Sequence, residues 1–429
     1  METMQWIIKI CGIIGTAITV LMAYKAIFFA VGFFRCRKFK PTERKHTYAI
    51  CVAARNEEKV IGNFLESVAH SDYPLEKLTV FVVADNCTDN TAQVVKNFQK
   101  EGLKVLVYEH NNPDERTKGF ALKYLFEKIE EDYGRESFEG YFVFDADNVV
   151  RANYFTKMNE AFDEGNKIIT SFRNSKNINQ NWISFSYAMH WLRTCLTENR
   201  GKGVLKQACR VQGTGFLFSN ELVKNGWKYT TLTEDRSFCT DAVVQNYKIS
   251  YCEDAVFYDE QPYKLKVALR QRLRWSKGHL QSAVENCPKL LYNMINPKKN
   301  FTIAYDSFFL NFPRHIEGAV RKIIVYALEL TIAILASAVY GWAIGLLIGV
   351  LTGIAKRWIG AILIEICVFI KYHKEMEKDK LARRIFHVLM FPFFDVIGKW
   401  TTYIALFKKI EWKPIPHETV MDMEKLMSK

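Results

Sequence analysis

Two carboxylates stand one residue apart in Asp145-Ala146-Asp147, directly after an apolar run (141–144) that predicts a buried strand. Carboxylate oxygens are the ligands that Mg²⁺ and Mn²⁺ prefer, and these cations often share them with the phosphates of a substrate. Acidic residues at such positions also fill turns and cap helices. Placement after a buried strand nevertheless favours a metal and diphosphate site at Asp145 and Asp147.

Two further acidic positions have residue types suited to binding and proton transfer. Asp85 ends the predicted strand 78–84 and can accept hydrogen bonds from a nucleobase or ribose, although a turn or helix cap within 85–90 is the alternative. Glu234 and Asp235 follow Thr233 in a polar loop, where a carboxylate within hydrogen-bond reach can act as a general base toward a hydroxyl group. Neither pattern is specific by itself.

The segment Gln271-Arg272-Leu273-Arg274-Trp275 is a more specific pattern. On a helix, residues 271, 274 and 275 share one face through the i, i+3, i+4 spacing, and that face offers an amide, a guanidinium and an indole. Arginine can pair with a diphosphate through two hydrogen bonds, and tryptophan is a flat platform for a sugar ring. The alternative is a basic amphipathic helix near a membrane, since further cations surround the motif.

Two glycine-containing segments can bring the backbone close to a ligand. Lys118 and Gly119 open a predicted helix (118–129), where the lysine can reach a phosphate or a base. Gly213, Thr214 and Gly215 precede a short apolar segment and suit a loop that approaches a ligand. An ordinary helix start and a plain turn are the alternatives.

These residues need a scaffold, and the sequence predicts an α/β fold. Strand patterns at 48–54, 78–84, 103–108 and 141–144 alternate with helix patterns, the first of them capped by Asn56. The alternation predicts a parallel, doubly wound sheet, which binds ligands beyond the carboxyl ends of its strands. The polar residues at these ends are Arg55, Asp85, Asp145 and Asp147.

The 429-residue chain is 49% hydrophobic and has a formal charge of +13, from 59 Lys plus Arg and 46 Asp plus Glu. The apolar share excludes wholesale disorder, and so positive a charge is typical of nucleic-acid binding or of a membrane protein with basic flanks. Because the basic clusters lie beside apolar runs, we expect a lipid bilayer and no nucleic acid as partner. The ten cysteines form no CxxC pair, which argues against a zinc site or a disulfide framework.

Three apolar runs divide the chain. Residues 10–34 are long enough to span a bilayer, residues 323–370 suit a hairpin of two spans, and residues 385–407 suit a broken span, a re-entrant segment or an interfacial helix. The cations after residue 34 place the following residues in the cytoplasm by the positive-inside rule. We therefore expect a multi-pass protein of the cell membrane with its catalytic domain in the cytoplasm.

The expected division is a transmembrane helix with a basic flank at 1–40, a cytoplasmic catalytic domain at 41–300, and interfacial and transmembrane helices with a cytoplasmic tail at 301–429. Residues 301–322 mix aromatic and charged side chains, which predicts an amphipathic helix on a membrane surface. A helix packed in the protein core is the alternative for that segment.

In order along the chain, the motifs resemble those of the membrane-embedded family 2 glycosyltransferases, which include the synthases of hyaluronan, cellulose, chitin and poly-N-acetylglucosamine. The resemblance covers residues 45–285, and five motifs in this order are not expected by chance. The motifs are Ala53-Ala54-Arg55-Asn56-Glu57-Glu58 followed by Asp85, Lys118-Gly119-Phe120-Ala121-Leu122, Asp145-Ala146-Asp147, Thr233-Glu234-Asp235, and the QxxRW motif from Gln271 to Trp275.

The resemblance implies a GT-A (Rossmann-like) fold with a mixed sheet flanked by helices, an inverting transfer from a UDP-sugar, and Mg²⁺ or Mn²⁺ as cofactor. Asp235, beside Glu234, would deprotonate the acceptor hydroxyl, and Asp147 with Asp145 would hold the metal ion. The implied donor-binding residues are Ala53, Arg55, Glu57, Asp85, Lys118, Asp145 and Arg274. The implied residues of the carbohydrate or lipid-linked acceptor site are Gln271, Trp275, Gly213 and Thr214.

Extension of a β-linked polysaccharide or glycolipid is the leading interpretation. The alternative is transfer of one sugar to a lipid carrier, as in polyprenyl-phosphate sugar synthases, which usually lack QxxRW. A non-enzymatic sensor of nucleotide sugars would be expected to carry degraded motifs, and none is degraded. Gln212-Gly213-Thr214-Gly215 replaces the Cys-Gly-Ser motif of the cellulose synthases, so processivity is not predicted, and the sequence identifies neither the sugar nor a partner subunit.

Overall fold

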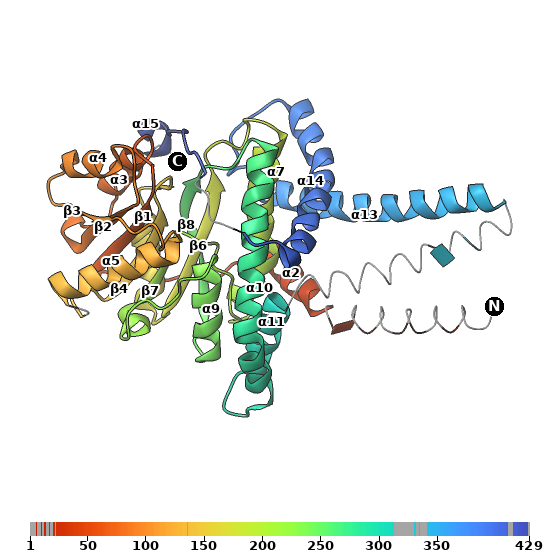
Figure 1. Ribbon diagram of the computed structural model, residues 1–429, viewed down its shortest axis with the longest axis horizontal. Coiled ribbons are helices and arrows are strands. Elements are labelled where there is room, and N and C mark those ends of the chain that lie inside the picture. Colours follow the sequence, from red (N-terminus) through yellow and green to blue (C-terminus); the bar gives the residue numbers. More distant parts are fainter. Residues whose placement is uncertain are drawn as a thin grey trace.

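The computed structural model describes residues 23–312 except 135, 341–410 and 415–427, with isolated residues before 23 and between 330 and 334. Within these residues, eight strands form one sheet in the order β3-β2-β1-β4-β7-β6-β8-β5 (Figure 1). The sheet contains both parallel and antiparallel pairs. The predicted mixed sheet flanked by helices is therefore confirmed.

The first half of the sheet is parallel, as the alternating strand and helix patterns predict. Strand β1 pairs with β2 on one side and β4 on the other, and β2 pairs with β3, all in parallel. The strands are β1 (Tyr48–Ala54), β2 (Leu78–Asp85), β3 (Lys104–His110) and β4 (Gly140–Asp145). The connecting helices are α3 (Ile61–Ala69), η1 (Leu75–Lys77), α4 (Thr91–Asn97) and α5 (Lys118–Tyr133).

The second half of the sheet introduces the antiparallel pairs. Strand β7 lies antiparallel to β4 and β6, β5 lies antiparallel to β8, and β6 and β8 are parallel. The strands are β5 (Val149–Val150), β6 (Ile168–Ser175), β7 (Phe216–Ser219) and β8 (Ile249–Asp259). The helices between them are α6 (Tyr154–Asp163), η3 (Asn220–Val223) and α9 (Glu234–Val244).

Alternate residues of the central strands supply two separate cores. In β1, Cys51 packs in the core that contains Leu122 of α5, whereas Ile50 packs in the core that contains Phe64 of α3. This is the two-residue period of a strand that is buried on both faces. Because the register is fixed on both faces, the strand ends, and the polar residues on them, are held at one edge of the sheet.

The predicted helix cap at Asn56 is wrong. Helix α3 begins at Ile61, and Asn56 has a left-handed backbone, with φ of 59°. Its side-chain oxygen accepts a hydrogen bond of 2.8 Å from the backbone N–H of Thr88 instead. Asparagine tolerates this conformation better than most residues, so Asn56 turns the chain after β1 and ties that turn to the loop after β2.

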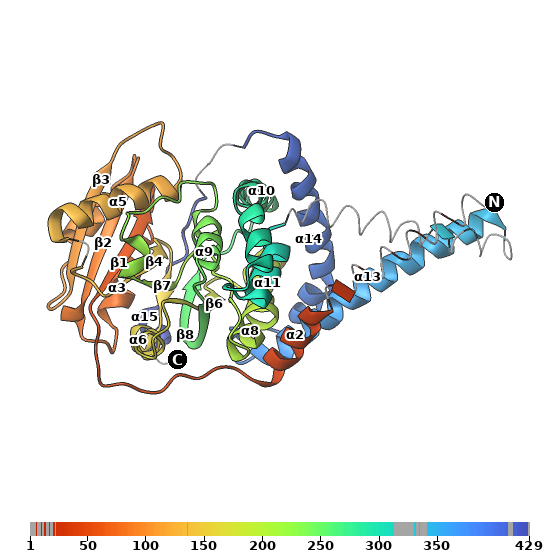
Figure 2. The ribbon, with the colours of Figure 1, turned by 90° about the horizontal axis from the view of Figure 1, so that it is seen from below.

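A helical layer covers the sheet on the side of β6 and β8 (Figure 2). Helix α10 packs on α9, α11 and α14, and α7 packs on α13 and α14. These helices are α7 (Trp182–Thr194), α10 (Leu265–Ile295), α11 (Phe301–Asn311), α13 (Trp342–Tyr372) and α14 (Leu381–Phe407). The shorter segments are α2 (Tyr24–Phe34), the π-helix η2 (Cys195–Arg200), α8 (Gly201–Val204) and α15 (Met423–Met427).

Helix α13 extends away from the sheet and the helical layer (Figure 1). Large apolar side chains on α13 and α14 are exposed, among them Leu363 at 57% and Phe407 at 91%. Within the described ranges, no helix combines the length and hydropathy expected of a membrane span. The predicted spans at 10–34 and 323–370 lie partly outside the described residues, and the division of the chain at 40 and 300 stays a prediction.

The remaining two apolar segments form helices that pack on the domain. Helix α11 covers residues 301–311, and Ile303 and Leu310 on it are buried, which favours the core-helix alternative for the described part of 301–322. Residues 313–322 lie outside the described residues. The run 385–407 lies in the continuous helix α14, with Pro392 inside it, so the described backbone is not broken there.

Candidate active site

A cavity of about 200 Å³ opens beyond the carboxyl ends of β1, β2 and β4. The cavity brings together thirteen of the fourteen predicted site residues, from seven separate stretches of the chain. They are Ala53, Arg55, Glu57, Asp85, Lys118, Asp145, Asp147, Gly213, Glu234, Asp235, Gln271, Arg274 and Trp275. This is the location that a doubly wound sheet predicts for a ligand.

Asp85, at the end of β2, is held by its neighbours and is only 3% exposed. The Arg55 guanidinium forms an ion pair with it, and Arg55 Nε donates a 2.9 Å hydrogen bond to the Asp85 backbone oxygen. The other carboxylate oxygen lies 2.9 Å from His110 Nδ1 and accepts a 2.8 Å hydrogen bond from Asn86. Arg55 therefore orients Asp85, and the predicted nucleoside contact stays a prediction.

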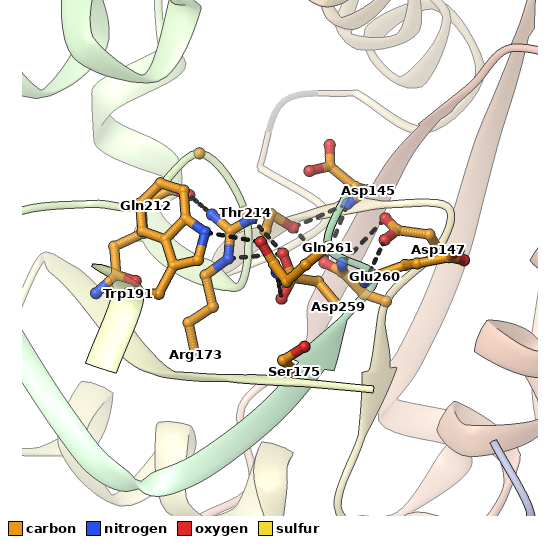
Figure 3. A network of polar contacts seen from close by, with 12 residues as sticks. Asp145, Asp147, Arg173, Ser175, Trp191, Gln212, Thr214, Asp259, Glu260 and Gln261 are labelled. Carbon is orange, nitrogen blue, oxygen red and sulfur yellow. Dashed lines mark hydrogen bonds and ion pairs between the residues drawn. The ribbon is translucent and has the colours of Figure 1, made fainter. Parts of the chain in front are cut away.

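Asp145 is the last residue of β4 and Asp147 follows it two residues later, but the two carboxylates have different surroundings (Figure 3). The Asp145 side chain is 38% exposed and forms an ion pair with Lys118. Asp147 is 4% exposed, and its carboxylate accepts hydrogen bonds of 2.8 Å from the Glu260 N–H and 3.2 Å from Asn148. Burial opposes ionisation of Asp147, but the nearby cations His417 and Lys176 hold its pKa below the usual value.

The two carboxylates have the donor chemistry of a Mg²⁺ or Mn²⁺ site, because hard cations take oxygen ligands. Across the described parts of the chain, no group of three or more His, Cys, Asp and Glu side chains is arranged to hold a metal ion. A pair of carboxylates still fits, since Mg²⁺ is usually bound by one or two carboxylates together with substrate phosphates and water. Lys118 is paired with Asp145 in this structure, so a cation bound there would share that carboxylate with the lysine.

Lys118 links three parts of the cavity from the first turn of α5. Its ammonium contacts Asp145, donates a 3.0 Å hydrogen bond to the Gly213 carbonyl and lies 3.8 Å from Glu234. Thr117 caps the helix by accepting from the Phe120 N–H, which fixes the backbone beside the lysine. Lys118 therefore connects Asp145 and the Gly213 loop with the acidic residues at the start of α9.

Glu234 and Asp235 are the first two residues of α9, where the helix dipole favours negative charge. Burial raises the pKa of Glu234 to about 7, although Lys118 lowers it in part. Asp235 is half-buried, and a Cβ on Gly213 would lie 3.8 Å from its carboxylate oxygen. Asp235 is thus the more accessible carboxylate and the one beside the Gly213 loop, whereas Glu234 is committed to Lys118.

Helix α10 presents Gln271, Arg274 and Trp275 to the cavity, as the i, i+3, i+4 spacing predicts. Arg274 donates a 2.8 Å hydrogen bond to the Leu232 carbonyl, just before the Thr233-Glu234-Asp235 segment. Gly278 lets this segment approach α10, because a Cβ there would lie 2.5 Å from Thr233. The QxxRW helix and the acidic segment are therefore packed as one unit.

Thr214 is the predicted site residue that does not line the cavity. It is 1% exposed, and its hydroxyl contacts Asn148 and accepts a 2.9 Å hydrogen bond from the Asp145 N–H. The protein itself thus uses this hydroxyl to support the loop that carries Asp145. The acceptor contact assigned to Thr214 stays a prediction without support from its position.

The structure adds cavity residues that sequence reasoning missed: Arg173, Trp191, Asp259, Glu260 and His417. Asp259 ends β8 and Glu260 follows it directly, so the rule that found Asp145 at the end of a strand could also have found them. The other three carry no local signal. Arg173 is an ordinary strand residue, Trp191 is an ordinary helix residue, and His417 is more than 350 residues from its partner Glu57.

His417 belongs to a C-terminal segment, residues 415–427, whose first residues line the cavity. The segment then continues beside α3 (Figure 1). Its Nδ1 lies 2.9 Å from Glu57, and the Glu260 carboxylate accepts 2.8 Å hydrogen bonds from the next two backbone N–H groups. Burial opposes protonation of His417, but Asp147 and Glu57 raise its pKa to about 10. The segment therefore brings a positive charge to the acidic side of the cavity.

The chain is similar to known proteins both in sequence and in structure. Residues 46–278 match the family described as glycosyltransferase-like family 2. A probable glycosyltransferase of Bacillus subtilis is 24% identical over 284 residues, which is 62% of this chain and 61% of the relative. The poly-β-1,6-N-acetyl-D-glucosamine synthase of Staphylococcus epidermidis is 25% identical over 235 residues, or 53% of each chain.

A glycolipid synthase and one solved structure are also similar to this chain. The β-monoglucosyldiacylglycerol synthase of Nostoc is 24% identical over 265 residues, covering 59% of this chain and 53% of the relative. The chain thus spans between about half and three fifths of the length of these curated relatives. A mannosyltransferase from Pyrobaculum calidifontis, solved with GDP-mannose and Mn²⁺, superposes with a TM-score of 0.58 at 16% identity, covering 86% of this chain and all of that one.

Proposed function

Because this chain belongs to glycosyltransferase-like family 2 and is a glycosyltransferase, we propose that it moves a hexose or N-acetylhexosamine from a UDP-sugar to a β-linked polysaccharide or glycolipid, with inversion. One observation carries the proposal. One cavity in the described part of the chain is lined by acidic residues suited to a metal-bound diphosphate, by the aromatic and amide groups of the QxxRW helix, and by the Asp235 carboxylate.

The proposed reaction is one displacement at the anomeric carbon of the donor. Asp235 accepts the proton of the acceptor hydroxyl, the freed oxygen forms the new glycosidic bond, and the bond to the β-phosphate breaks. Arg274 and Lys118 offset the negative charge that develops on the departing diphosphate, since both cations line the cavity near it. A divalent cation held by Asp145 and Asp147 would supply further charge neutralisation there.

We also propose that the protein acts at a membrane with the cavity on the cytoplasmic side. The support is the exposed apolar surface of α13 and α14, which includes Leu363, Ile370, Trp400 and Phe407. A second support is the cluster of cations directly after residue 34. Two of the similar proteins have names that point to glycolipid or polysaccharide products, which suits acceptors handled at a membrane.

The test is a donor and product screen with the full-length purified protein. UDP-glucose, UDP-N-acetylglucosamine and GDP-mannose are each supplied with Mn²⁺, and release of nucleoside diphosphate is measured together with label in polymer and in chloroform-soluble lipid. We expect turnover with a UDP-sugar. Label confined to a polyprenyl-phosphate product would favour the lipid-carrier alternative, and no release with any donor would overturn the proposal.

The base assignment is tested with a matched pair of variants. Asp235→Asn should lower kcat by about 100-fold to 10,000-fold while donor affinity changes little, because it removes only the proton acceptor. Glu234→Gln changes the adjacent carboxylate in the same way and should retain far more activity. Full activity in Asp235→Asn would contradict the assignment.

A further inference from the structure

Trp191, on α7, forms part of the cavity wall next to the QxxRW helix. Its ring centroid lies 5.4 Å from that of Trp275, and the two rings are inclined at 71°. Both indoles line the cavity, so two aromatic surfaces meet at a steep angle around the same space. Such a corner offers flat apolar surface for the C–H face of a sugar ring.

A dedicated network holds the Trp191 indole in place (Figure 3). The Arg173 guanidinium lies over the ring at 3.8 Å from its centroid, and the indole N–H donates a 3.1 Å hydrogen bond to Gln261. Gln261 donates in turn to Asp259, which also accepts a 2.7 Å hydrogen bond from Arg173 Nε. The ring is therefore fixed on one face and at its N–H.

The same network offsets the charge of the cation that lies on Trp191. Arg173 and Asp259, both buried, are ion-paired with each other, so the guanidinium charge is offset within the wall. Arg173 Nη1 further donates a 2.5 Å hydrogen bond to the Gln212 carbonyl. Because Arg173 is already paired with Asp259, it is poorly suited to bind the phosphate of a lipid carrier, whereas the apolar faces of the two indoles suit an uncharged sugar ring.

Two amide oxygens next to the aromatic corner need a donor. Gln212 is 3% exposed and gives its N–H to Cys195, and Gln271 lies on the face of α10 that carries Trp275. Among the residues that the structure describes, neither Gln212 Oε1 nor Gln271 Oε1, although buried, has a hydrogen-bond partner. Both residues line the cavity, and unpaired buried acceptors there call for a ligand with hydroxyl donors.

From these observations, and resting on the proposed function, we propose that Trp191 and Gln212 bind the terminal sugar ring of the acceptor together with Trp275 and Gln271. Arg173 and Gln261 are positioning residues that hold Trp191. The acceptor of this enzyme therefore ends in a sugar, as in an oligosaccharide or a glycolipid, and is not a bare lipid phosphate. The hydroxyl groups of that sugar donate to the two amide oxygens.

The experiment measures acceptor and donor separately in the full chain, using the UDP-sugar that the parent protein turns over. The acceptor probes are soluble β-linked glucose and N-acetylglucosamine oligosaccharides, monoglucosyldiacylglycerol and polyprenyl phosphate. Trp191→Leu should raise KM for the sugar-terminated acceptor about tenfold, and Trp191→Phe about threefold, since aromatic contacts of this kind are worth about 0.5–1.5 kcal/mol. The dissociation constant for UDP should change less than twofold.

The matched control is Trp182→Phe, on the same helix. Trp182 packs on Phe393 and Phe394 of α14, does not line the described cavity, and should leave the acceptor KM unchanged. A direct readout is quenching of tryptophan fluorescence by the oligosaccharide, which should be reduced in Trp191→Phe but not in Trp182→Phe. Gln261→Met should raise the acceptor KM with little change in kcat, because it releases the indole N–H.

Three results have distinct meanings. If the parent protein transfers sugar to oligosaccharide or glycolipid and the Trp191 variants keep their acceptor KM, this inference is wrong while the proposed function stands. If the parent uses only polyprenyl phosphate, the sugar-ring site is likewise wrong, although the enzyme is still a glycosyltransferase. If the parent turns over no UDP-sugar, the failure lies with the proposed function.

Discussion

Replacing Glu234 by glutamine should remove a pH-dependent loss of stability. Glu234 is buried at the first position of α9, and burial raises its pKa from 4.5 to about 7 despite the nearby Lys118. A raised carboxylate pKa means that the folded protein holds this proton more tightly than the unfolded chain does. Between pH 4.5 and 7 the unfolded chain gives up the proton first, so the free energy of unfolding falls as the pH rises.

The size of the effect follows from the two pKa values. One pH unit corresponds to about 1.4 kcal/mol, so a pKa that moves from 4.5 to about 7 corresponds to about 3 kcal/mol once the pH exceeds both values. At pH 5 only a small part of this decrease in the free energy of unfolding has occurred, and at pH 8 the decrease is nearly complete. The glutamine in Glu234→Gln is uncharged in both the folded and the unfolded protein. The free energy of unfolding of the variant, relative to that of the parent, should therefore rise by about 2 to 3 kcal/mol between pH 5 and pH 8.

The assay is urea unfolding of parent and variant in the same buffer and detergent at pH 5 and pH 8. The offset between them at pH 5 includes lost contacts to Lys118, so the informative quantity is its change with pH. Glu127→Gln is the control, because Glu127 is a solvent-exposed carboxylate on α5. If the difference between Glu234→Gln and the parent stays constant across this range, the reasoning about burial is refuted.

Three further predictions concern the metal site, the C-terminal segment and the packing of α10. Asp147→Asn should increase at least tenfold the concentration of Mn²⁺ that gives half-maximal activity, because it removes a negatively charged oxygen donor. If the variant needs no more Mn²⁺ than the parent, Asp147 is not a metal ligand. His417→Ala should speed proteolysis within residues 415–427, measured by mass spectrometry, because it removes the contact with Glu57; equal cleavage rates would argue against this anchor. Gly278→Ala should lower the free energy of unfolding by about 1–3 kcal/mol and reduce kcat, because the new methyl group would meet Thr233. The control is Gly360→Ala on α13, where an added Cβ would have no atom within 4 Å, and it should have little effect on thermal unfolding.

Much of the fold could be read from the sequence because its signals are local. The four predicted parallel strands match β1 to β4 closely, since each is a short apolar run bounded by polar residues. The carboxylates at their ends could be predicted to share one edge of the sheet, because parallel strands end on the same side. The cap at Asn56 failed because its side chain bonds across to Thr88, a contact that no local pattern records.

The candidate site divides in the same way. Residue type and order pointed to Asp145, Asp147, Asp235 and the QxxRW helix as site candidates, because each of these motifs consists of residues that are close together in the sequence. From the sequence, only the family resemblance favoured Asp235 over Glu234 as the base. The physical difference between them comes from packing, which buries Glu234 near Lys118 and leaves Asp235 beside the Gly213 loop. It also could not tell that the hydroxyl of Thr214 is used inside the protein.

The amino-acid sequence by itself determined the family, the parallel half of the sheet and the acidic and QxxRW motifs, because these depend on residues that are close along the chain. Only the tertiary structure decided that Trp191, Arg173 and His417 share a cavity with them. These side chains come from α7, β6 and the C-terminal segment, and they meet because the sheet and the helical layer bury them together. Contacts between such distant positions arise from packing, which a one-dimensional pattern does not contain.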